Sequence, residues 1–162
     1  PRKIVVRRAR RTDAGAVAQL YFETIHRVNA RDYNVRQIHA WAPQVLPSAF
    51  WRRRWRNYQV WVATEGLRVV GFAEIEPTGR IDCFYVAHDR QARGIGRALM
   101  KRIKQEAQRS GTERLRADVS ITAQPFFEKK VFAVSGGEDM VSAVQFLALS
   151  NGENGWKKEK KQ

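Results

Sequence analysis

The most informative segment of this chain is Val86-Ala87-His88-Asp89-Arg90-Gln91-Ala92-Arg93-Gly94-Ile95-Gly96-Arg97-Ala98-Leu99. Its pattern is that of a strand end, a polar loop and an amphipathic helix that begins with two glycines. The first amides of a helix have no partners within it, and the helix dipole adds partial positive charge, so a helix start favours anions. Glycines 94 and 96 would let a bulky phosphate approach the backbone, and Arg90, Arg93 and Arg97 add positive charge. The segment therefore predicts a site for a diphosphate.

The sequence on either side alternates between strand and helix patterns. We expect strands at residues 3–9, 58–64, 67–75, 80–86 and 112–120, with a last strand within 141–149. We expect helices at residues 12–28, 35–41, 48–56, 94–108 and 123–130. This order predicts a mixed α/β domain built around a central sheet.

Two common phosphate-binding motifs do not fit the segment. A Walker loop requires Gly-Lys-Ser/Thr, and the dinucleotide fingerprint requires a third glycine where Leu99 stands. The segment instead resembles motif A of the GCN5-related N-acetyltransferase (GNAT) family, whose pattern is Arg/Gln-x-x-Gly-x-Gly/Ala. Gln91, Gly94 and Gly96 match that pattern, and residues 81–86 have the character of the strand that precedes it in the family.

Two other segments strengthen the resemblance. Residues 120–129 are similar to the family's Asn-x-x-Ala-x-x-Phe-Tyr motif, with Ser120 in place of asparagine and Phe127 in place of tyrosine. Residues 30–43 resemble a segment of the YafP-like bacterial subgroup. The resemblance extends over residues 3–130 and fails after Lys130, where Val131 replaces a glycine of the family. We therefore expect one acetyltransferase domain over residues 1–150, atypical from residue 131, and a flexible basic tail over 151–162.

The resemblance implies both the fold and the reaction. The fold would be the GNAT α+β fold, a twisted, mixed, mostly antiparallel sheet of about six to seven strands flanked by helices. The chain would use acetyl-CoA and no metal to acetylate a primary amine, which attacks the thioester directly, and a small-molecule acceptor is favoured over a protein. The cofactor-binding residues implied by the family are Phe84, Val86, Gln91, Ala92, Arg93, Gly94, Ile95, Gly96, Arg97, Ala98, Ser120 and Phe127.

The acceptor arrives as an ammonium, so the reaction needs a base. Strand alternation predicts that Asp82 points to one face of its strand and Cys83 and Tyr85 to the other. Asp82 is our first candidate base, with an ion pair to Arg80 as its structural alternative. Glu74 is the second candidate, with a solvent-facing position as its alternative.

A proton donor for the departing thiolate is less evident. The family's tyrosine is replaced by Phe127, so Tyr85 or Tyr33 would have to supply the proton, unless the thiolate leaves without a dedicated acid. The first helices cover the acceptor in this family, and the resemblance places Asp32, Tyr33, Gln37 and Trp41 beside it. For Tyr33 and Trp41, a place in the core is an equal alternative.

The net charge of +14 raises the possibility of a nucleic-acid binder. Most of the excess lies in residues 1–11 and 157–162; without these ends, 20 basic and 15 acidic residues remain. Nucleic-acid binding is therefore an alternative that we do not favour, as is a protein that binds coenzyme A without catalysis. The cluster Arg52, Arg53, Arg54 and Arg56, interleaved with Trp51 and Trp55, could suit phosphates, but we favour a helix with a solvent-facing arginine face and a tryptophan stripe.

The cysteine, histidine and apolar content argues against disulfide-bonded, metal-binding and membrane-spanning proteins. Cys83 is the single cysteine, and the three histidines are scattered, so we expect neither a disulfide nor a metal site. There is no apolar run of membrane-spanning length, so a cytoplasmic protein is expected. The resemblance leaves room for a homodimer.

Overall fold

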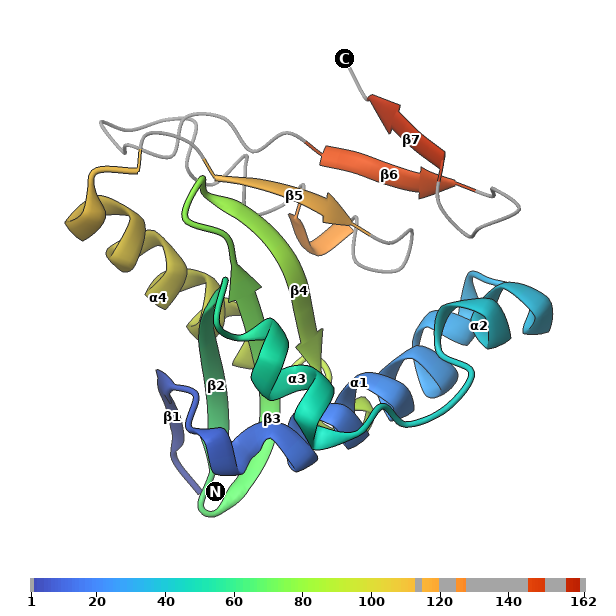
Figure 1. The fold of residues 1–162 in the computed structure, drawn as a ribbon, viewed down its shortest axis with the longest axis horizontal. Coiled ribbons are helices and arrows are strands. Elements are labelled where there is room, and N and C mark those ends of the chain that lie inside the picture. The colour runs from blue at the N-terminus through green and yellow to red at the C-terminus, as the bar shows by residue number, and fades with distance from the viewer. Residues whose placement is uncertain (1, 113–114, 120–124, 128–145, 151–156, 161–162) are drawn as a thin grey trace.

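The computed structural model describes residues 2–112, 115–119, 125–127, 146–150 and 157–160 (Figure 1). Its strands are β1 (Ile4–Arg8), β2 (Gln59–Glu65), β3 (Arg68–Ile75), β4 (Arg80–Val86), β5 (Arg116–Val119), β6 (Phe146–Ser150) and β7 (Lys157–Lys160). Its α-helices are α1 (Ala14–Arg27), α2 (Val35–Trp41), α3 (Ser48–Arg54) and α4 (Ile95–Ser110), with 3-10 turns η1 (Arg11–Asp13), η2 (Asn29–Arg31) and η3 (His88–Arg90). In the described part of the chain, no helix combines the length and apolar character needed to cross a membrane.

The seven strands pair in chain order and form one mixed sheet. β1, β2, β3 and β4 pair antiparallel, β4, β5 and β6 pair in parallel, and β6 and β7 pair antiparallel. The expected fold class, a mixed and mostly antiparallel sheet flanked by helices, is confirmed. β6 overlaps the last expected strand, and β7 lies within the segment expected to be a tail. The division of the chain at residue 150 stays a prediction.

β3 shows how the helices divide between the two faces of the sheet. The Phe72 ring lies edge-on to Trp51 of α3 at 5.7 Å, and Trp51 also packs against Tyr21 of α1. Gly71 points to the opposite face, where an added Cβ would come within 3.0 Å of Ile95 of α4. α1 and α3 therefore cover one face of the sheet, and α4 covers the other.

α4 is an amphipathic helix with a glycine at each end. Its buried side chains recur at helical spacing, at Ile95, Leu99, Met100, Ile103 and Ala107. Gly94 precedes the helix and Gly111 follows it, both in the left-handed conformation, with φ of 81° and 71°. Both positions suit glycine because other residues meet a Cβ penalty there. The helix expected over 94–108 is therefore confirmed with a shift of one or two residues at each end.

Asp13 joins β1 to the start of α1, and its loss should destabilise the fold. Arg7 donates to both carboxylate oxygens of Asp13, at 2.8 and 3.0 Å, and the Arg10 amide donates to it at 2.6 Å. Burial acts to raise the pKa of Asp13, but these donors outweigh burial and hold the pKa below its ordinary value of 3.8. Asp13→Asn should lower the free energy of unfolding by about 1–3 kcal/mol at neutral pH.

Urea denaturation at several pH values would test this prediction. A carboxylate with a depressed folded-state pKa stabilises the fold above its unfolded pKa, and the effect is lost as the pH falls through the folded value. The difference between wild type and Asp13→Asn should therefore shrink below about pH 4. Asp89→Asn is a matched control, because Asp89 makes the same two-bond pair with Arg68 on the surface and should cost about 0–1 kcal/mol. Equal losses in the two variants would contradict the role given to Asp13.

Candidate functional site

The loop between β4 and α4 presents an open helix start. The backbone adopts left-handed φ values of 57° at Ala92 and 81° at Gly94. The first hydrogen bond of α4 runs from the Ala98 amide to the Gly94 carbonyl at 3.0 Å, so the amides of residues 95–97 lie ahead of the helical ladder. Residues 91–94 are exposed. The loop therefore has the geometry of an anion-binding helix start.

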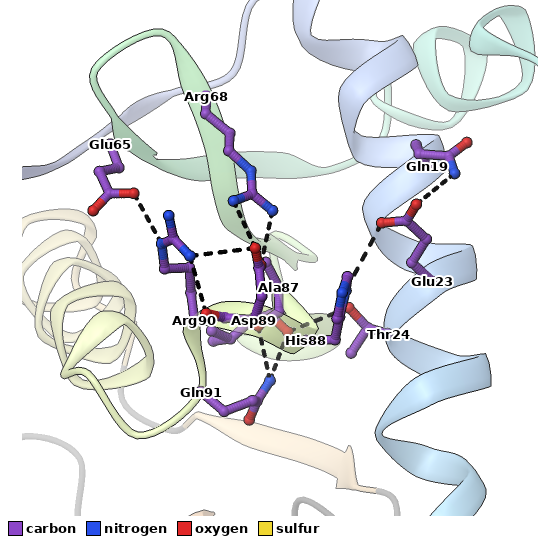
Figure 2. Close-up of polar contacts among 11 residues, drawn as sticks. Gln19, Glu23, Thr24, Glu65, Arg68, Ala87, His88, Asp89, Arg90 and Gln91 are labelled. Atoms are coloured by element: carbon purple, nitrogen blue, oxygen red, sulfur yellow. Dashed lines mark hydrogen bonds and ion pairs between the residues drawn. The ribbon is translucent and has the colours of Figure 1, made fainter.

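A network of ion pairs holds this loop against β2 and β3, as Figure 2 shows. Arg68 donates to both oxygens of Asp89, at 2.9 and 2.8 Å, and these hydrogen bonds lower the pKa of Asp89 to about 2. Arg90 pairs with Glu65 at 2.9 Å and with Asp89 at 3.2 Å. The charge of Arg90 is thus compensated, contrary to our expectation that it would add positive charge to the loop. Arg93 and Arg97 are exposed.

The Val86 carbonyl is the point where the loop meets α1. Gln91 Nε2 donates to it at 2.7 Å, and the buried Thr24 hydroxyl donates to it at 3.2 Å (Figure 2). The next residue, Ala87, donates its amide to Val70 of β3. Because backbone groups alternate along a strand, the amide and carbonyl of Val86 point away from β3. Gln91 therefore anchors the loop through its side chain, and Val86 directs its amide toward the side of β5.

Gly96 has a packing role that the motif did not indicate. An added Cβ at this position would lie 3.2 Å from the Phe126 ring and 3.6 Å from the Phe84 ring. Phe84 also packs edge-on against Phe127, whose side chain is 2% exposed. The absence of a Cβ at Gly96 is thus explained by aromatic packing. At Gly94, in contrast, an added Cβ would meet no atom within 4 Å and would face open space.

β4 and β5 separate shortly after they begin to pair. In the described residues they pair at Arg80 with Arg116 and at Ile81 with Ala117. Beyond these pairs β4 continues for five residues to Val86, and Figure 1 shows the two strands diverging. We call this divergence the splay. It begins at Asp82 and leads along β4 to the loop that precedes α4.

β4 carries one extra residue at the start of the splay. Cys83 pairs with Glu74 and Ile81 with Ile75, so the register leaves Asp82 without an opposite residue on β3. Such a bulge interrupts the alternation of side chains. A carboxylate oxygen of Glu74, one of Asp82 and the Cys83 sulfur all lie within 4.8 Å of one another. The expectation that Asp82 and Cys83 point to opposite faces is therefore wrong.

Arg54 of α3 lies among these three side chains. Its Nε donates to Glu74 Oε2 at 2.5 Å, and its Nη2 pairs with Asp82 Oδ2 and lies 3.9 Å from the Cys83 sulfur. The guanidinium also stacks over the Tyr58 ring at 4.4 Å. A fixed positive charge thus already stands among atoms that could otherwise bind a metal ion.

Both candidate bases are held by further donors. Arg80 Nη2 lies 3.0 Å from Asp82 Oδ1, which is the ion pair given above as the structural alternative. Trp55 Nε1 donates to Glu74 Oε1 at 2.9 Å. The Glu74 side chain is 0% exposed and the Asp82 side chain 20% exposed, so Glu74 does not face solvent and Asp82 is the more accessible of the two.

The charge states of this cluster follow from burial and from its ion pairs. Burial acts to lower the pKa of Arg54, but the neighbouring negative charge of Glu74 raises it above the ordinary value, so Arg54 stays protonated. Burial raises the pKa of the Cys83 thiol well above its ordinary value, and Glu74 adds to this effect. Cys83 is therefore a neutral thiol at physiological pH and is not activated as a nucleophile.

The sequence profile of the acetyltransferase (GNAT) domain family matches residues 29–148. This chain belongs to the GNAT acetyltransferase family. The YafP protein of Escherichia coli K12, described as an uncharacterized N-acetyltransferase, is 32% identical over 131 residues, which are 80% of this chain and 81% of YafP. A GCN5-related N-acetyltransferase from Rhodopseudomonas palustris superimposes with a TM-score of 0.73 at 29% identity, over 78% of this chain and 79% of that one.

More distant acetyltransferase structures share the fold. The PaiA N-acetyltransferase of Thermoplasma acidophilum, solved in complex with coenzyme A, has a TM-score of 0.69 at 16% identity, over 79% of this chain and 88% of its own. The YncA protein of Salmonella typhimurium, solved with acetyl-CoA, has a TM-score of 0.53 at 22% identity, over 68% of this chain and 66% of its own.

In this GNAT domain, the residues expected beside the acceptor lie around α2. The Tyr33 and Trp41 rings meet edge-on at 5.4 Å, and both are partly buried against the core of Ile25, Ile38 and Ala42. Gln37 accepts a hydrogen bond from the Asn34 amide at 2.9 Å and so caps α2, while Asp32 is exposed. The contacts of Tyr33 and Trp41 fit the core alternative as well as the acceptor one.

Tyr85 lies on the same side of the GNAT sheet as Cys83. It stacks on Phe72 at 5.7 Å and meets Tyr21 edge-on at 5.1 Å. Burial raises the pKa of Tyr85 well above its ordinary value. Tyr85 therefore keeps its proton at neutral pH. Ser120, which was expected to bind the cofactor, lies outside the described residues.

Sequence reasoning missed Arg54 and Trp55. Both were assigned to a helix whose arginines face water, and Arg53 and Arg56 are indeed exposed. The missed signal is spacing, because Trp51, Arg54 and Trp55 recur at positions three and four apart and therefore share one helix face. An arginine on the same face as a buried tryptophan favours acidic partners nearby, and the buried Glu74 and the partly buried Asp82 supply them.

Proposed function

We propose that this protein transfers an acetyl group from acetyl-CoA to a primary amine, with the amine attacking the thioester directly in a ternary complex. The observation that carries the proposal is the splay, which starts at Asp82 and leads along β4 to the open start of α4. Membership in the acetyltransferase family supports the acyl transfer itself. Relatives of the same fold are solved with coenzyme A or acetyl-CoA, which supports this choice of cosubstrate.

The cofactor would bind along the splay. Under this proposal, backbone amides of residues 93–97 bind the diphosphate, whereas the Ala98 amide is already bonded to the Gly94 carbonyl, and the exposed Arg93 and Arg97 add positive charge near the diphosphate. The amide of Val86, which points away from β3, is free to bind the pantetheine arm, with Gln91 and Ala92 shaping the loop beside it. Phe84 and Phe127 would pack near the same arm, and Ser120 stays a predicted member of the site.

Asp82 is the carboxylate best placed to act as the base. An amine of pKa about 10.4 is almost entirely protonated at neutral pH, so a nearby acceptor of its proton is required. Asp82 is at the start of the splay and partly exposed, whereas Glu74 is enclosed by Arg54 and Trp55. Tyr85 remains the proposed proton donor, although its raised pKa makes it a weak acid.

We propose a small-molecule amine as the acceptor, bound near Asp32, Tyr33, Gln37 and Trp41. A second candidate function is acetyl-CoA binding without catalysis. It is favoured by one observation: Asp82 and Glu74 are both engaged in ion pairs with Arg54. We also propose a cytoplasmic location. A homodimer is a further proposal, which light scattering would test.

A two-part measurement tests the proposal. Acetyl-CoA should raise the melting temperature, because a ligand at one hundred times its Kd adds about 2.7 kcal/mol to stability. Release of free coenzyme A thiol should then identify an acceptor within a panel of small amines and lysine-containing peptides. Binding without thiol release for any amine would favour the non-catalytic alternative. No thermal shift at millimolar acetyl-CoA would contradict both functions.

A further inference from the structure

We propose that Arg54 is the positioning residue of this site and that it acts by holding the Asp82 carboxylate at the start of the splay. This inference rests on the proposed function, with Asp82 as the base. Arg54 comes from α3, Glu74 from β3 and Asp82 from β4, so one guanidinium connects a helix to two consecutive strands of the sheet.

The contacts of Arg54 are directional. Its Nε is committed to Glu74 at 2.5 Å, which leaves Nη2 for Asp82 Oδ2. The Tyr58 ring lies against the guanidinium at 4.4 Å, and the Arg54 side chain is 24% exposed. The guanidinium is planar, with one edge hydrogen-bonded to Glu74 and one face lying on Tyr58, so its orientation is fixed. A lysine ammonium acts as a point charge and has no such fixed plane.

The fold needs this cation for a physical reason. Glu74 and Asp82 approach within 4.8 Å in a partly buried region, where two carboxylates without a counter-charge would repel. The bulge brings Asp82 to the side of Glu74, and Arg54 stabilises that placement by binding both. Arg80 orients the second oxygen of Asp82 at 3.0 Å. Arg54 thus sets where the Asp82 carboxylate lies when an amine approaches.

Acting through Asp82 has a consequence that kinetics can detect. If Arg54 contributes only by placing Asp82, its removal should add nothing once the Asp82 carboxylate is already lost. We would therefore measure kcat, KM and acetyl-CoA affinity for four variants: Arg54→Met, Arg54→Lys, Asp82→Asn and the double variant Arg54→Met with Asp82→Asn. Arg53→Met is the matched control, because Arg53 is the exposed neighbour of Arg54 on α3.

The expected result is a non-additive pattern. Arg54→Met should lower kcat by about 10²-fold or more, the range for a general base, with acetyl-CoA affinity within about threefold of wild type. The double variant should be no more than about threefold slower than Asp82→Asn alone. Arg54→Lys should recover part of the loss, and Arg53→Met should match wild type. In Arg54→Lys, the acid limb of the pH profile of kcat/KM should move to higher pH, because lysine keeps the positive charge but lacks the planar set of donors, and fewer hydrogen bonds to the Asp82 carboxylate leave its pKa higher.

Arg54→Met also leaves the buried Glu74 carboxylate without its cation, which can prevent folding. We would therefore also make Arg54→Met with Glu74→Gln. This variant removes both charges of the buried pair, and the glutamine oxygen can still accept the hydrogen bond of Trp55. This variant should bind acetyl-CoA and show the same loss of kcat.

The outcomes separate the two claims. The inference is overturned if kcat stays at the wild-type value in Arg54→Met or in Arg54→Met with Glu74→Gln. It is also overturned if the kcat losses of Arg54→Met and Asp82→Asn multiply when the two changes are combined. Both results leave the acetyltransferase proposal in place. An unimpaired Asp82→Asn variant would overturn the inference through the loss of its base. A wild-type protein that acetylates no amine would contradict the proposed function itself.

Discussion

Asp82→Asn should lower kcat for amine acetylation by about 10²- to 10⁴-fold and leave acetyl-CoA affinity within about threefold of wild type. Asparagine has the shape of aspartate but cannot accept the proton of an incoming ammonium. Asp82 lies at the start of the splay, whereas the proposed diphosphate site is at the far end of β4 and the start of α4. The change should therefore affect the chemical step and not cofactor binding. Thiol release at saturating acetyl-CoA and calorimetric titration would measure the two quantities.

Glu76→Gln is the matched control for this variant. Glu76 pairs with Arg80 at 3.0 Å, as Asp82 does, so the control also removes one partner of Arg80 without touching the proposed base. Its kcat should stay within about threefold of wild type, because surface ion pairs contribute little. Equal losses in Glu76→Gln and Asp82→Asn would show that disturbing Arg80 is enough to slow turnover. Full activity in Asp82→Asn would show that Asp82 is not the base and would leave Glu74 or a water molecule as the candidate.

Gly94→Ala should weaken acetyl-CoA binding by about tenfold or more. Gly94 has φ of 81° and open space where its Cβ would be, beside the amides proposed to bind the diphosphate. Under the proposed function, a methyl group there would project into space that the diphosphate needs. Loss of one hydrogen bond to a charged group costs about 1.5–3 kcal/mol, and about 1.4 kcal/mol is a factor of ten in affinity. Calorimetric titration with coenzyme A would measure the change.

Gly111→Ala provides an internal control for backbone strain. Gly111 lies at the other end of α4, is also left-handed with φ of 71°, and also has open space at its Cβ position. Both alanines meet the left-handed penalty of about 1–2 kcal/mol, so the two variants should lose similar stability. Only Gly94→Ala should lose affinity for coenzyme A. If both variants bind equally well, the start of α4 is not the diphosphate site.

Gly96, the other glycine of the motif, is a poorer probe of binding. An added Cβ at Gly96 would lie only 3.2 Å from the Phe126 ring, so a side chain there would first disturb packing. The sequence pattern treats the two glycines alike, because it contains no information about which rings approach the helix start. Their separate roles became apparent from contacts between β4, α4 and the segment that contains Phe126 and Phe127.

Local features were well predicted. The residues 35–41 expected to be helical are α2, the three strands from residue 58 to Val86 have the expected order and pairing, and the helix after Gly94 is present. These features depend on hydrophobic period, caps and turn residues within a few positions of one another. The family of the chain was predicted in the same way, from the short spacing of Gln91, Gly94 and Gly96, and it is confirmed by the family profile.

The surroundings of the candidate base could not be predicted in this way. Strand parity placed Asp82 and Cys83 on opposite faces, and the bulge opposite Glu74 cancels that parity. Arg54 was expected on a solvent-facing side of its helix, but it forms ion pairs with Glu74 and Asp82. A bulge depends on the register of two strands, and a buried ion pair depends on where a helix meets them.

The sequence by itself thus determined the acetyltransferase family, the sheet with its flanking helices, and the glycine-bounded helix that follows β4, because these depend on neighbouring residues. The tertiary structure alone decided that Asp82 turns toward Glu74 and that Arg54 lies between them. The reason is that burying like charges together is stable only when an opposite charge arrives with them, and that charge comes from a helix distant in sequence from both strands.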